Sequence, residues 1–496
     1  MPVEVIYSWV PVWACLASLL AVVPIVWFGK RGMVNAREGA TLVAGVVKFA
    51  LVLSMLPLVR GGKVVECTLV EIAPGLALAF RVDGLGMLFA LVASSLWIVT
   101  SVYAAGYMRG LKEHAQTRFA AFFAVSLSAT LGVAFSANLL TMYVFYEMLS
   151  LATFPLVTHH QDKEARTGGR TYLSYLLGTS IGFALPAMIF TYVKSGGNLD
   201  FSVMGVLAGH VGHGEALVLL LLFVFGFAKA GLMPFHSWLP GAMVAPTPVS
   251  ALLHAVAVVK VGVFCVIRVV TGIFGIDFLK EMDLGIVVSW IAAFTVVVSS
   301  LIALSQDSLK RRLAFSTVGQ LGYIVLGVSF LTPYGVTGSM LHIAMHAFGK
   351  ITLFYCAGAI FVACGKKYVS ELSGLGRSMP FTMGAFTIGA LSVIGFPPTG
   401  GFLSKLYLLL GAAQTGHFSL VVVYVISTVL NAAYFFPIFY IAFFGKDSGA
   451  PRKLQEAPPA CVVPLCLTAV GSVLLFFFPD VLLGLAESML PPGEQP

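Results

Sequence analysis

Residues 225–260, FGFAKAGLMPFHSWLPGAMVAPTPVSALLHAVAVVK, join two apolar runs through a segment rich in proline and glycine. Proline lacks a backbone N–H and glycine weakens a helix, so GLMPFHSWLP (231–240) and APTP (245–248) predict a broken helix. GFPPTGG at 395–401 predicts a second break. In a bilayer, the backbone groups freed by a break must be satisfied inside protein or by water. Both stretches therefore indicate irregular backbone within a membrane-embedded helix bundle.

The composition around these stretches is that of an integral membrane protein. Of 496 residues, 59% are hydrophobic and only 10% are charged, and the mean hydropathy is +0.96. Soluble domains are about 25% charged, and a membrane-spanning helix needs about 20 apolar residues. We therefore expect an all-α membrane protein with about 14 transmembrane helices, which excludes a large extramembrane catalytic domain. The predicted spans are 7–28, 38–59, 85–107, 117–136, 138–157, 169–194, 214–232, 247–271, 284–305, 309–331, 336–364, 380–415, 418–445 and 459–486.

The distribution of lysine and arginine predicts the orientation. Loops after odd-numbered spans hold 18 of these residues, loops after even-numbered spans hold 5, and the remaining 6 lie within spans. By the positive-inside rule, the odd-numbered loops face the cytoplasm and both termini lie outside. We expect a multi-pass protein of the prokaryotic cytoplasmic (inner) membrane, and topology explains the net charge of +8 better than nucleic-acid binding does.

The cysteine pattern predicts no cofactor and no metal. The seven cysteines include no CxxC pair and no Cys/His cluster at metal-ligand spacing, which argues against iron–sulfur, haem and zinc sites. No P-loop is present. The chain thus has no redox or hydrolytic chemistry of its own, and whether it is part of an ion-translocating oxidoreductase stays open.

One acidic residue lies in the middle of a predicted span. Of 21 acids, Glu147 alone is far from a loop, a terminus or a span edge. A charge at the bilayer centre costs at least about 2.5 kcal/mol and is a functional candidate by default. A static ion pair between two helices is the structural alternative.

Several basic residues are similarly deep. Lys229 precedes the first helix break, Lys405 follows the second, and Lys260 lies near the centre of the eighth span. A lysine beside an interrupted helix can exchange protons. Lys229 and Lys405 could instead extend to an interface, whereas Lys260 is too deep to do so easily.

The eleventh span adds a ladder of exchangeable groups. His342, His346 and Lys350 are spaced i, i+4 and i+8, so they cover about 80° of one face and about 12 Å of the axis. This spacing predicts a proton relay. His254 lies about 120° around its helix from Lys260, so the two side chains need not touch. The sequence therefore supports a place for His254 in the relay less strongly than for the other residues.

The remaining polar residues of the spans carry weaker expectations. Ser316, Thr317, Gln320 and Tyr323 recur at helical spacing and either hold bridging waters or join helices. Lys48 and Arg268 are expected to extend to an interface, and His159 and His160 to lie at the surface.

Five stretches together resemble one family. They are YEMLSLATFPL (146–156), the opening stretch 225–260, DSLKRRLAFSTVGQLGY (307–323), HIAMHAFGKITLF (342–354) and GFPPTGGFLSK (395–405). They resemble the antiporter-like membrane subunits shared by respiratory complex I, membrane-bound hydrogenases and Mrp-type multisubunit cation/proton antiporters. The resemblance implies three N-terminal helices (1–107), two inverted five-helix repeats (117–271 and 284–445) and a fourteenth helix (459–486).

The resemblance also implies roles for individual residues. Glu147 and Lys229 would form a charge pair, from which a hydrated axis continues through buried residues of the eighth and eleventh spans to Lys405. The residues assigned to this proton relay, with His254 as the weakest member, are Glu147, Lys229, Lys260, His254, His342, His346, Lys350 and Lys405.

These features favour a proton-translocating subunit of a larger membrane complex. The resemblance implies that a lysine at position 405 is shared by D-type antiporter subunits and N-type complex I subunits, whereas M-type complex I subunits have glutamate there. Taken together with GFPPTGGF, Lys405 favours a D-type subunit of an Mrp-like monovalent cation/proton antiporter. The alternative is a proton-pumping subunit of a redox-driven complex. The expected partners are other membrane subunits, including homologous antiporter-like ones, with protons as the transported ion and sodium left open. A stand-alone transporter of an organic solute is disfavoured because nearly all intramembrane polar groups are proton-exchangeable.

Overall fold

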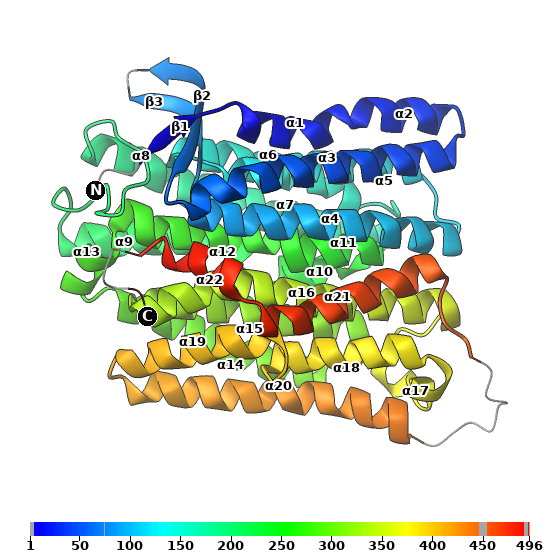
Figure 1. The fold of residues 1–496 in the computed structure, drawn as a ribbon. Coiled ribbons are helices and arrows are strands. Elements are labelled where there is room, and N and C mark those ends of the chain that lie inside the picture. Colours follow the sequence, from blue (N-terminus) through cyan, green and yellow to red (C-terminus); the bar gives the residue numbers. More distant parts are fainter. Residues whose placement is uncertain (1–3, 74, 446–453, 491–494, 496) are drawn as a thin grey trace.

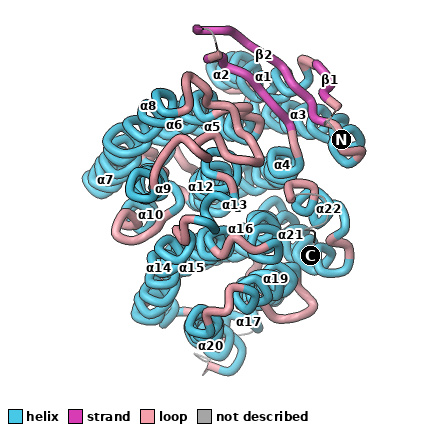
Figure 2. Tube along the Cα trace, turned by 90° about the vertical axis from the view of Figure 1, so that its left-hand side faces the viewer, coloured by secondary structure: helices cyan, strands magenta, loops and turns pink. Residues whose placement is uncertain are grey.

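The computed structural model describes residues 4–73, 75–445, 454–490 and 495. Its long helices lie side by side in one bundle, seen from the side in Figure 1 and nearly end-on in Figure 2. In these described residues, eleven helices are long and apolar enough to cross a membrane, and two shorter apolar helices, α9 (His213–Gly226) and α18 (Pro380–Ile394), accompany them. This confirms the all-α membrane class, while the count of fourteen spans stays a prediction. Lys446, Arg452 and Lys453 of the loop tally lie outside the described residues.

The first half of the chain forms the upper part of Figure 1. Its helices are α1 (Val10–Leu20), α2 (Val22–Lys30), α3 (Val34–Arg60), α4 (Gly84–Gly110), α5 (Gln116–Ala134), α6 (Leu139–Val157), α7 (Lys163–Thr179), the π segment η1 (Ser180–Ala184), α8 (Leu185–Lys194) and α9 (His213–Gly226). The middle contains η2 (Ala228–Ala230), α10 (Trp238–Gly241), η3 (Ala242–Val244), α11 (Thr247–Leu252), η4 (Leu253–Ala257), α12 (Val258–Arg268), η5 (Val269–Phe274) and α13 (Ile276–Glu281).

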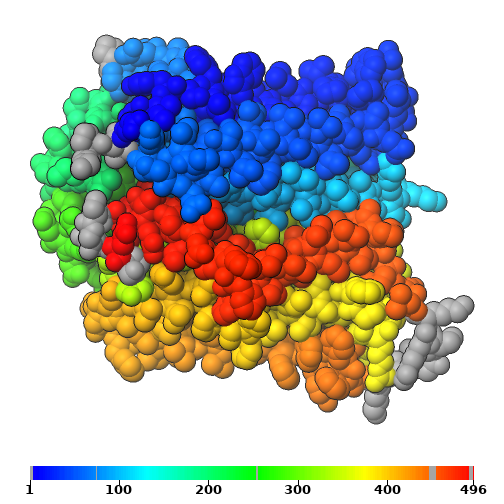
Figure 3. Space-filling model, viewed as in Figure 1, coloured from blue at the N-terminus to red at the C-terminus, as the bar shows by residue number. Residues whose placement is uncertain are grey.

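The second half follows with longer, more regular helices. They are α14 (Gly285–Ser305), α15 (Leu309–Ser329), α16 (Pro333–Cys364), η6 (Val369–Glu371), α17 (Leu375–Ser378), α18 (Pro380–Ile394), α19 (Gly400–Gln414), α20 (Phe418–Phe444), α21 (Pro459–Phe477) and α22 (Asp480–Glu487). Figure 3 shows the C-terminal helices, in red, crossing the surface between the blue N-terminal helices and the yellow second half.

Both predicted helix breaks are present. The first begins earlier than predicted, because α9 ends at Gly226 and Phe227 leaves the helical conformation with φ −86° and ψ 56°. Lys229 therefore lies in the short 3₁₀ turn η2 and not in the preceding helix. The second break runs between α18 and α19, where Gly395 adopts a φ of +90° that a residue with a side chain rarely takes.

A small sheet at one end of the bundle was not expected from the sequence. It consists of β1 (Val5–Tyr7), β2 (Val64–Ala73) and β3 (Leu76–Val82), with β1 parallel and β3 antiparallel to β2. The β2 and β3 segments, of 10 and 7 residues, are too short to span a bilayer as helices. Figure 1 places β1 and α22, near the two ends of the chain, at the same end of the bundle.

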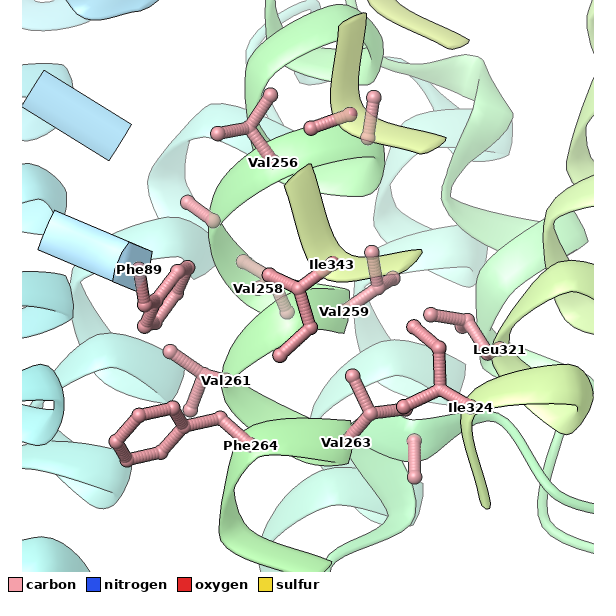
Figure 4. Packing of buried hydrophobic residues seen from close by; sticks show 14 of the residues in the cluster. Phe89, Val256, Val258, Val259, Val261, Val263, Phe264, Leu321, Ile324 and Ile343 are labelled. Carbon is pink, nitrogen blue, oxygen red and sulfur yellow. The ribbon is translucent and has the colours of Figure 1, made fainter. Parts of the chain in front are cut away.

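The helix α12 lies at the centre of the bundle and is apolar apart from Lys260 and Arg268. Its residues are at most 3% exposed, as expected for a helix that packs against others around its whole circumference. Figure 4 shows Phe264 of α12 beside Phe89 of α4, and Val259 and Val263 facing Leu321 and Ile324 of α15.

Lys48 and Arg268 do not extend to an interface, and that prediction was wrong. Lys48 is fully buried and donates a hydrogen bond to Ser18 Oγ at 2.6 Å. Arg268 is 3% exposed and forms a two-pronged ion pair with Asp83, with N···O distances of 2.5 and 2.6 Å. Both cations found partners inside the protein because neighbouring helices supply polar groups that periodicity along one helix does not reveal.

Candidate functional site

Three predicted residues form a continuous contact between α12 and α16. The Nζ atom of Lys260 lies 2.6 Å from Nδ1 of His346, and the rings of His346 and His342 stack with centroids 5.6 Å apart and planes inclined by 22°. All three side chains are at most 2% exposed. A lysine amine and an imidazole nitrogen at this distance can share a proton.

Polar side chains of neighbouring helices extend this contact. Nδ1 of His342 lies 2.8 Å from Ser404 Oγ on α19, and its Nε2 lies 3.1 Å from Gln320 Oε1 on α15. A hydroxyl can both donate and accept a proton, so Ser404 connects His342 to the helix that carries Lys405.

Lys350 takes a separate branch, in which α15 and α20 supply the partners. It donates to Ser316 Oγ at 2.7 Å, and Ser316 lies 2.7 Å from the hydroxyl of Tyr434. That hydroxyl donates to Asn431 Oδ1 at 2.7 Å. The ladder predicted on α16 therefore divides. His346 contacts α12, His342 contacts α15 and α19, and Lys350 faces α15 and α20.

The polar residues predicted on α15 differ in what they contact. Ser316 and Gln320 contact relay side chains, whereas Thr317 donates to the carbonyl of Leu313 within its own helix. The ring of Tyr323 lies 4.6 Å from Lys405 Nζ and 6.2 Å from the His342 ring, and so lies between them.

Lys405 is held at the second helix break. Its Nζ donates to the carbonyl oxygen of Ile394, the last residue of α18, at 3.1 Å. That carbonyl has lost its partner in the helix because the chain turns away at Gly395. A Cβ at Gly395 would lie 2.6 Å from the Lys405 side chain, so glycine is required for this approach as well as for the turn.

Lys229 contacts the helix of Glu147 but not its carboxylate. Its Nζ donates to the carbonyl of Tyr146 at 2.9 Å and to Ser150 Oγ at 2.6 Å, and lies 3.1 Å from the centre of the Tyr146 ring. Within the described chain, no ion pair of 4.0 Å or less joins Lys229 to Glu147, and both carboxylate oxygens are buried without a hydrogen-bond partner. The charge pair implied by the resemblance is therefore not a direct contact in this structure.

A close backbone contact sets the position of Lys229 relative to Lys260. Gly262, two residues after Lys260 on α12, faces the backbone of Lys229 and Ala230 so tightly that an added Cβ would collide with it. The absence of a side chain at 262 therefore lets α12 pack directly on η2. The side chain of His254 lies outside the described residues.

Sequence reasoning missed several partners in this site. Ser150, Ser404, Tyr434 and Asn431 are each ordinary polar residues in apolar helices and carry no signal alone. Ser404 adjoins Lys405 and Ser150 lies three residues after Glu147, so proximity to the predicted residues was the available indication.

His159 was predicted to be a surface residue, and this was wrong. Its side chain is 0% exposed and lies beside Glu113, His114 and His160 at the ends of α4 and α6. Burial, together with the neighbouring histidines and Arg118, lowers the pKa of His159 to about 4.

Comparison with known proteins identifies relatives in two kinds of membrane complex. The family described as NADH:quinone oxidoreductase/Mrp antiporter, transmembrane, matches residues 136–431. NADH-quinone oxidoreductase subunit N of Desulforudis audaxviator is 33% identical, over 95% of this chain and 94% of that protein. The Na(+)/H(+) antiporter of Alkalihalophilus pseudofirmus has an A-type subunit that is 31% identical, over 97% of this chain and 62% of that protein. A chain of the Mrp complex from Dietzia sp. superposes with a TM-score of 0.86 at 21% identity, covering 97% of this chain and 96% of that one.

Proposed function

The chain belongs to the NADH:quinone oxidoreductase/Mrp antiporter transmembrane family, and from this membership we propose that it translocates protons as one subunit of a multisubunit membrane complex. The observation that carries the proposal is the contact of Lys260 with His346, 2.6 Å apart in the middle of the bundle. From this contact the route continues toward the second helix break through His342 on α16, Gln320 and Tyr323 on α15, and Ser404 on α19.

The charges along this route favour proton exchange over a static structural role. In the part of the chain that is described, no carboxylate lies within 4.0 Å of Lys260, Lys350 or Lys405. A buried cation held for structure alone is normally paired, because an uncompensated charge is costly. Neutral hydroxyl, amide and imidazole partners instead suit lysines that alternate between the protonated and the neutral form.

We propose that proton transfer along the route begins at Glu147 and Lys229. Because the lysine contacts residues on both sides of Glu147 and not the carboxylate, a small movement of η2 changes the strength of the through-space attraction. A proton leaving Lys229 then passes to Lys260 and onward to Lys405. Each charge moved against 100 mV needs about 2.3 kcal/mol, which a partner must supply.

The test is transport by complexes that carry Lys260→Met. We expect proton transport in vesicles, normalised to the amount of assembled complex, to fall at least tenfold. Lys367→Met is the matched control because Lys367 lies in a loop outside the route. Equal transport by both variants would refute the route.

For the kind of complex, we propose a D-type subunit of an Mrp-like cation/proton antiporter, on the basis of Lys405 and GFPPTGGF. A proton-pumping subunit of a redox-driven complex is the second candidate, favoured by the subunit N relative that matches over nearly its whole length. Purification of the native complex distinguishes them. Co-purifying iron–sulfur proteins support the redox-driven complex, and membrane subunits alone support the antiporter.

We also infer a cytoplasmic-membrane location with both termini outside. The 18 against 5 distribution of loop lysines and arginines supports this orientation, and the position of β1 and α22 at one end of the bundle is consistent with two termini on the same side. A cysteine added at the C-terminus should react with an impermeant thiol reagent applied to intact cells. Labelling only after lysis would show that the C-terminus faces the cytoplasm and would refute this orientation.

A further inference from the structure

Three histidines surround one carboxylate oxygen where the α4–α5 connection meets the end of α6. Oε2 of Glu113 lies 3.8 Å from Nδ1 of His114, 3.9 Å from Nε2 of His159 and 3.7 Å from Nδ1 of His160. These distances are too long for hydrogen bonds, which would be about 2.7–3.2 Å. Four polar atoms thus converge without bonding one another.

The hydrogen bond made by His114 fixes where its lone pair points. Its Nε2 lies 3.1 Å from the carbonyl oxygen of His159, and a carbonyl can only accept, so Nε2 carries the hydrogen. In the neutral ring, Nδ1 is then bare and faces the Glu113 oxygen. A second group that fixes the tautomer of a histidine in this way is typical of metal-ligating imidazoles.

His159 supplies an independent observation. Its side chain is 0% exposed, yet neither ring nitrogen has a hydrogen-bond partner. A buried, unsatisfied imidazole is costly and uncommon. A ligand located among Glu113, His114 and His160 would satisfy its Nε2.

The separations suit a small divalent cation. Zn²⁺ binds histidine nitrogen at about 2.0–2.1 Å and carboxylate oxygen at about 2.0–2.2 Å, which puts tetrahedral ligand atoms about 3.3 Å apart. The candidate ligand atoms of Glu113, His114 and His159 all lie within 4.8 Å of one another. Modest side-chain rotations would bring these ligand atoms to the separations that a bound zinc ion requires.

We propose that Glu113, His114 and His159 bind a divalent transition metal of the zinc class, with His160 as a fourth ligand. Imidazole ligands favour zinc, nickel or copper over magnesium and calcium, which prefer all-oxygen sites. Motif spacing does not reveal this site, because its two halves are separated by 45 residues. It is distinct from the route through Lys260 and does not depend on the proposed function.

Metal binding would join the two connections at this end of the bundle. His159 lies two residues beyond α6, the helix that carries Glu147, and His114 lies two residues before α5. The guanidinium of Arg118, which donates to the His159 carbonyl at 2.8 Å, is the nearby positive charge that opposes a cation. The single charge of Glu113 offsets it, so the imidazoles decide the affinity.

The test measures Zn²⁺ binding by the full chain, purified without a polyhistidine tag and stripped with a chelator. Competition with a chromophoric zinc indicator should give one saturable site per chain. His114→Gln and Glu113→Gln should each weaken it at least about tenfold. His210→Gln is the control, because His210 is an exposed histidine outside the cluster.

A second measurement separates loss of folding from loss of a ligand. The side chain of His114 is 53% exposed, so its replacement should leave the unfolding temperature of the metal-free chain unchanged, unlike replacement of buried His159. Co²⁺ added in place of zinc should give visible absorption bands of nitrogen coordination that His114→Gln removes. Absence of saturable binding by the wild-type chain, or equal affinity in wild type and His114→Gln, would overturn the proposal.

Discussion

The contact between α12 and η2 gives the sharpest prediction, for Gly262→Ala. An added Cβ would lie 2.7 Å from the Lys229 carbonyl oxygen and closer still to the Lys229 carbonyl carbon and the Ala230 nitrogen, whereas ordinary contacts begin at 3.4 Å. The closest of these atoms is the Ala230 nitrogen, and to clear it the helix and the turn must separate by more than about 1 Å, since backbone atoms cannot rotate away as a side chain can.

Two energies of opposite sign decide the effect on stability. Alanine is more favourable than glycine within a helix by about 1 kcal/mol. Overpacking against backbone costs about 1–3 kcal/mol, and the upper part of this range applies because three backbone atoms collide. We expect a net destabilisation of about 1–2 kcal/mol.

The effect on transport should be larger than the effect on stability. The separation moves Lys229 away from Lys260, and displacements near 1 Å can cost about 100-fold in steps that depend on positioning. We expect proton transport in vesicles to fall at least tenfold while the complex still assembles.

Gly384→Ala provides the matched control. Gly384 lies within α18, and an added Cβ would have no neighbour within 4 Å. This variant should keep full transport and an equal or slightly higher melting temperature. Wild-type transport and stability in Gly262→Ala would show that the α12–η2 contact does not position Lys229.

Three further changes test other parts of the route and the bundle. Glu147→Gln should reduce transport at least tenfold with little change in melting temperature, because the carboxylate makes no hydrogen bond that glutamine would lose; a large drop in assembly would indicate a structural role. Lys405→Glu should impair transport far more than Lys367→Glu, since only the first reverses a buried charge; equal transport by the two variants in vesicles with an imposed pH gradient would place Lys405 off the route. Arg268→Gln should destabilise the chain by about 3 kcal/mol, because it removes the ion-pair partner of Asp83; the low end of the range for a broken buried pair applies, since Asp83 is 16% exposed and keeps its hydrogen bond from the Gly86 N–H, and an unchanged thermal melt in detergent would refute this.

Much of the fold was predictable because the bilayer imposes simple rules on sequence. Apolar runs of about 20 residues indicate helices that span the membrane, and proline with glycine inside such a run indicates a break. Both breaks are present at or within a few residues of their predicted positions. The three strands were missed, since they lie at the end of the bundle where these rules do not apply.

The exceptional residues of the bundle could be identified without any structure, because an ionisable group in an apolar helix stands out from its neighbours. Glu147, Lys229, Lys260, the two histidines of α16, Lys350 and Lys405 were all recognisable in this way.

Which of these groups meet depends on the packing of the helices. Periodicity describes one helix at a time, whereas Lys260 and His346 are 86 residues apart and contact each other through the packing of α12 on α16. The same holds for Arg268 with Asp83, separated by 185 residues, and for His159, which becomes buried only because another connection folds over it. Contacts between helices depend on their rotation and depth relative to one another, and those are set by the whole packed bundle and by glycines such as Gly262 that permit close approach.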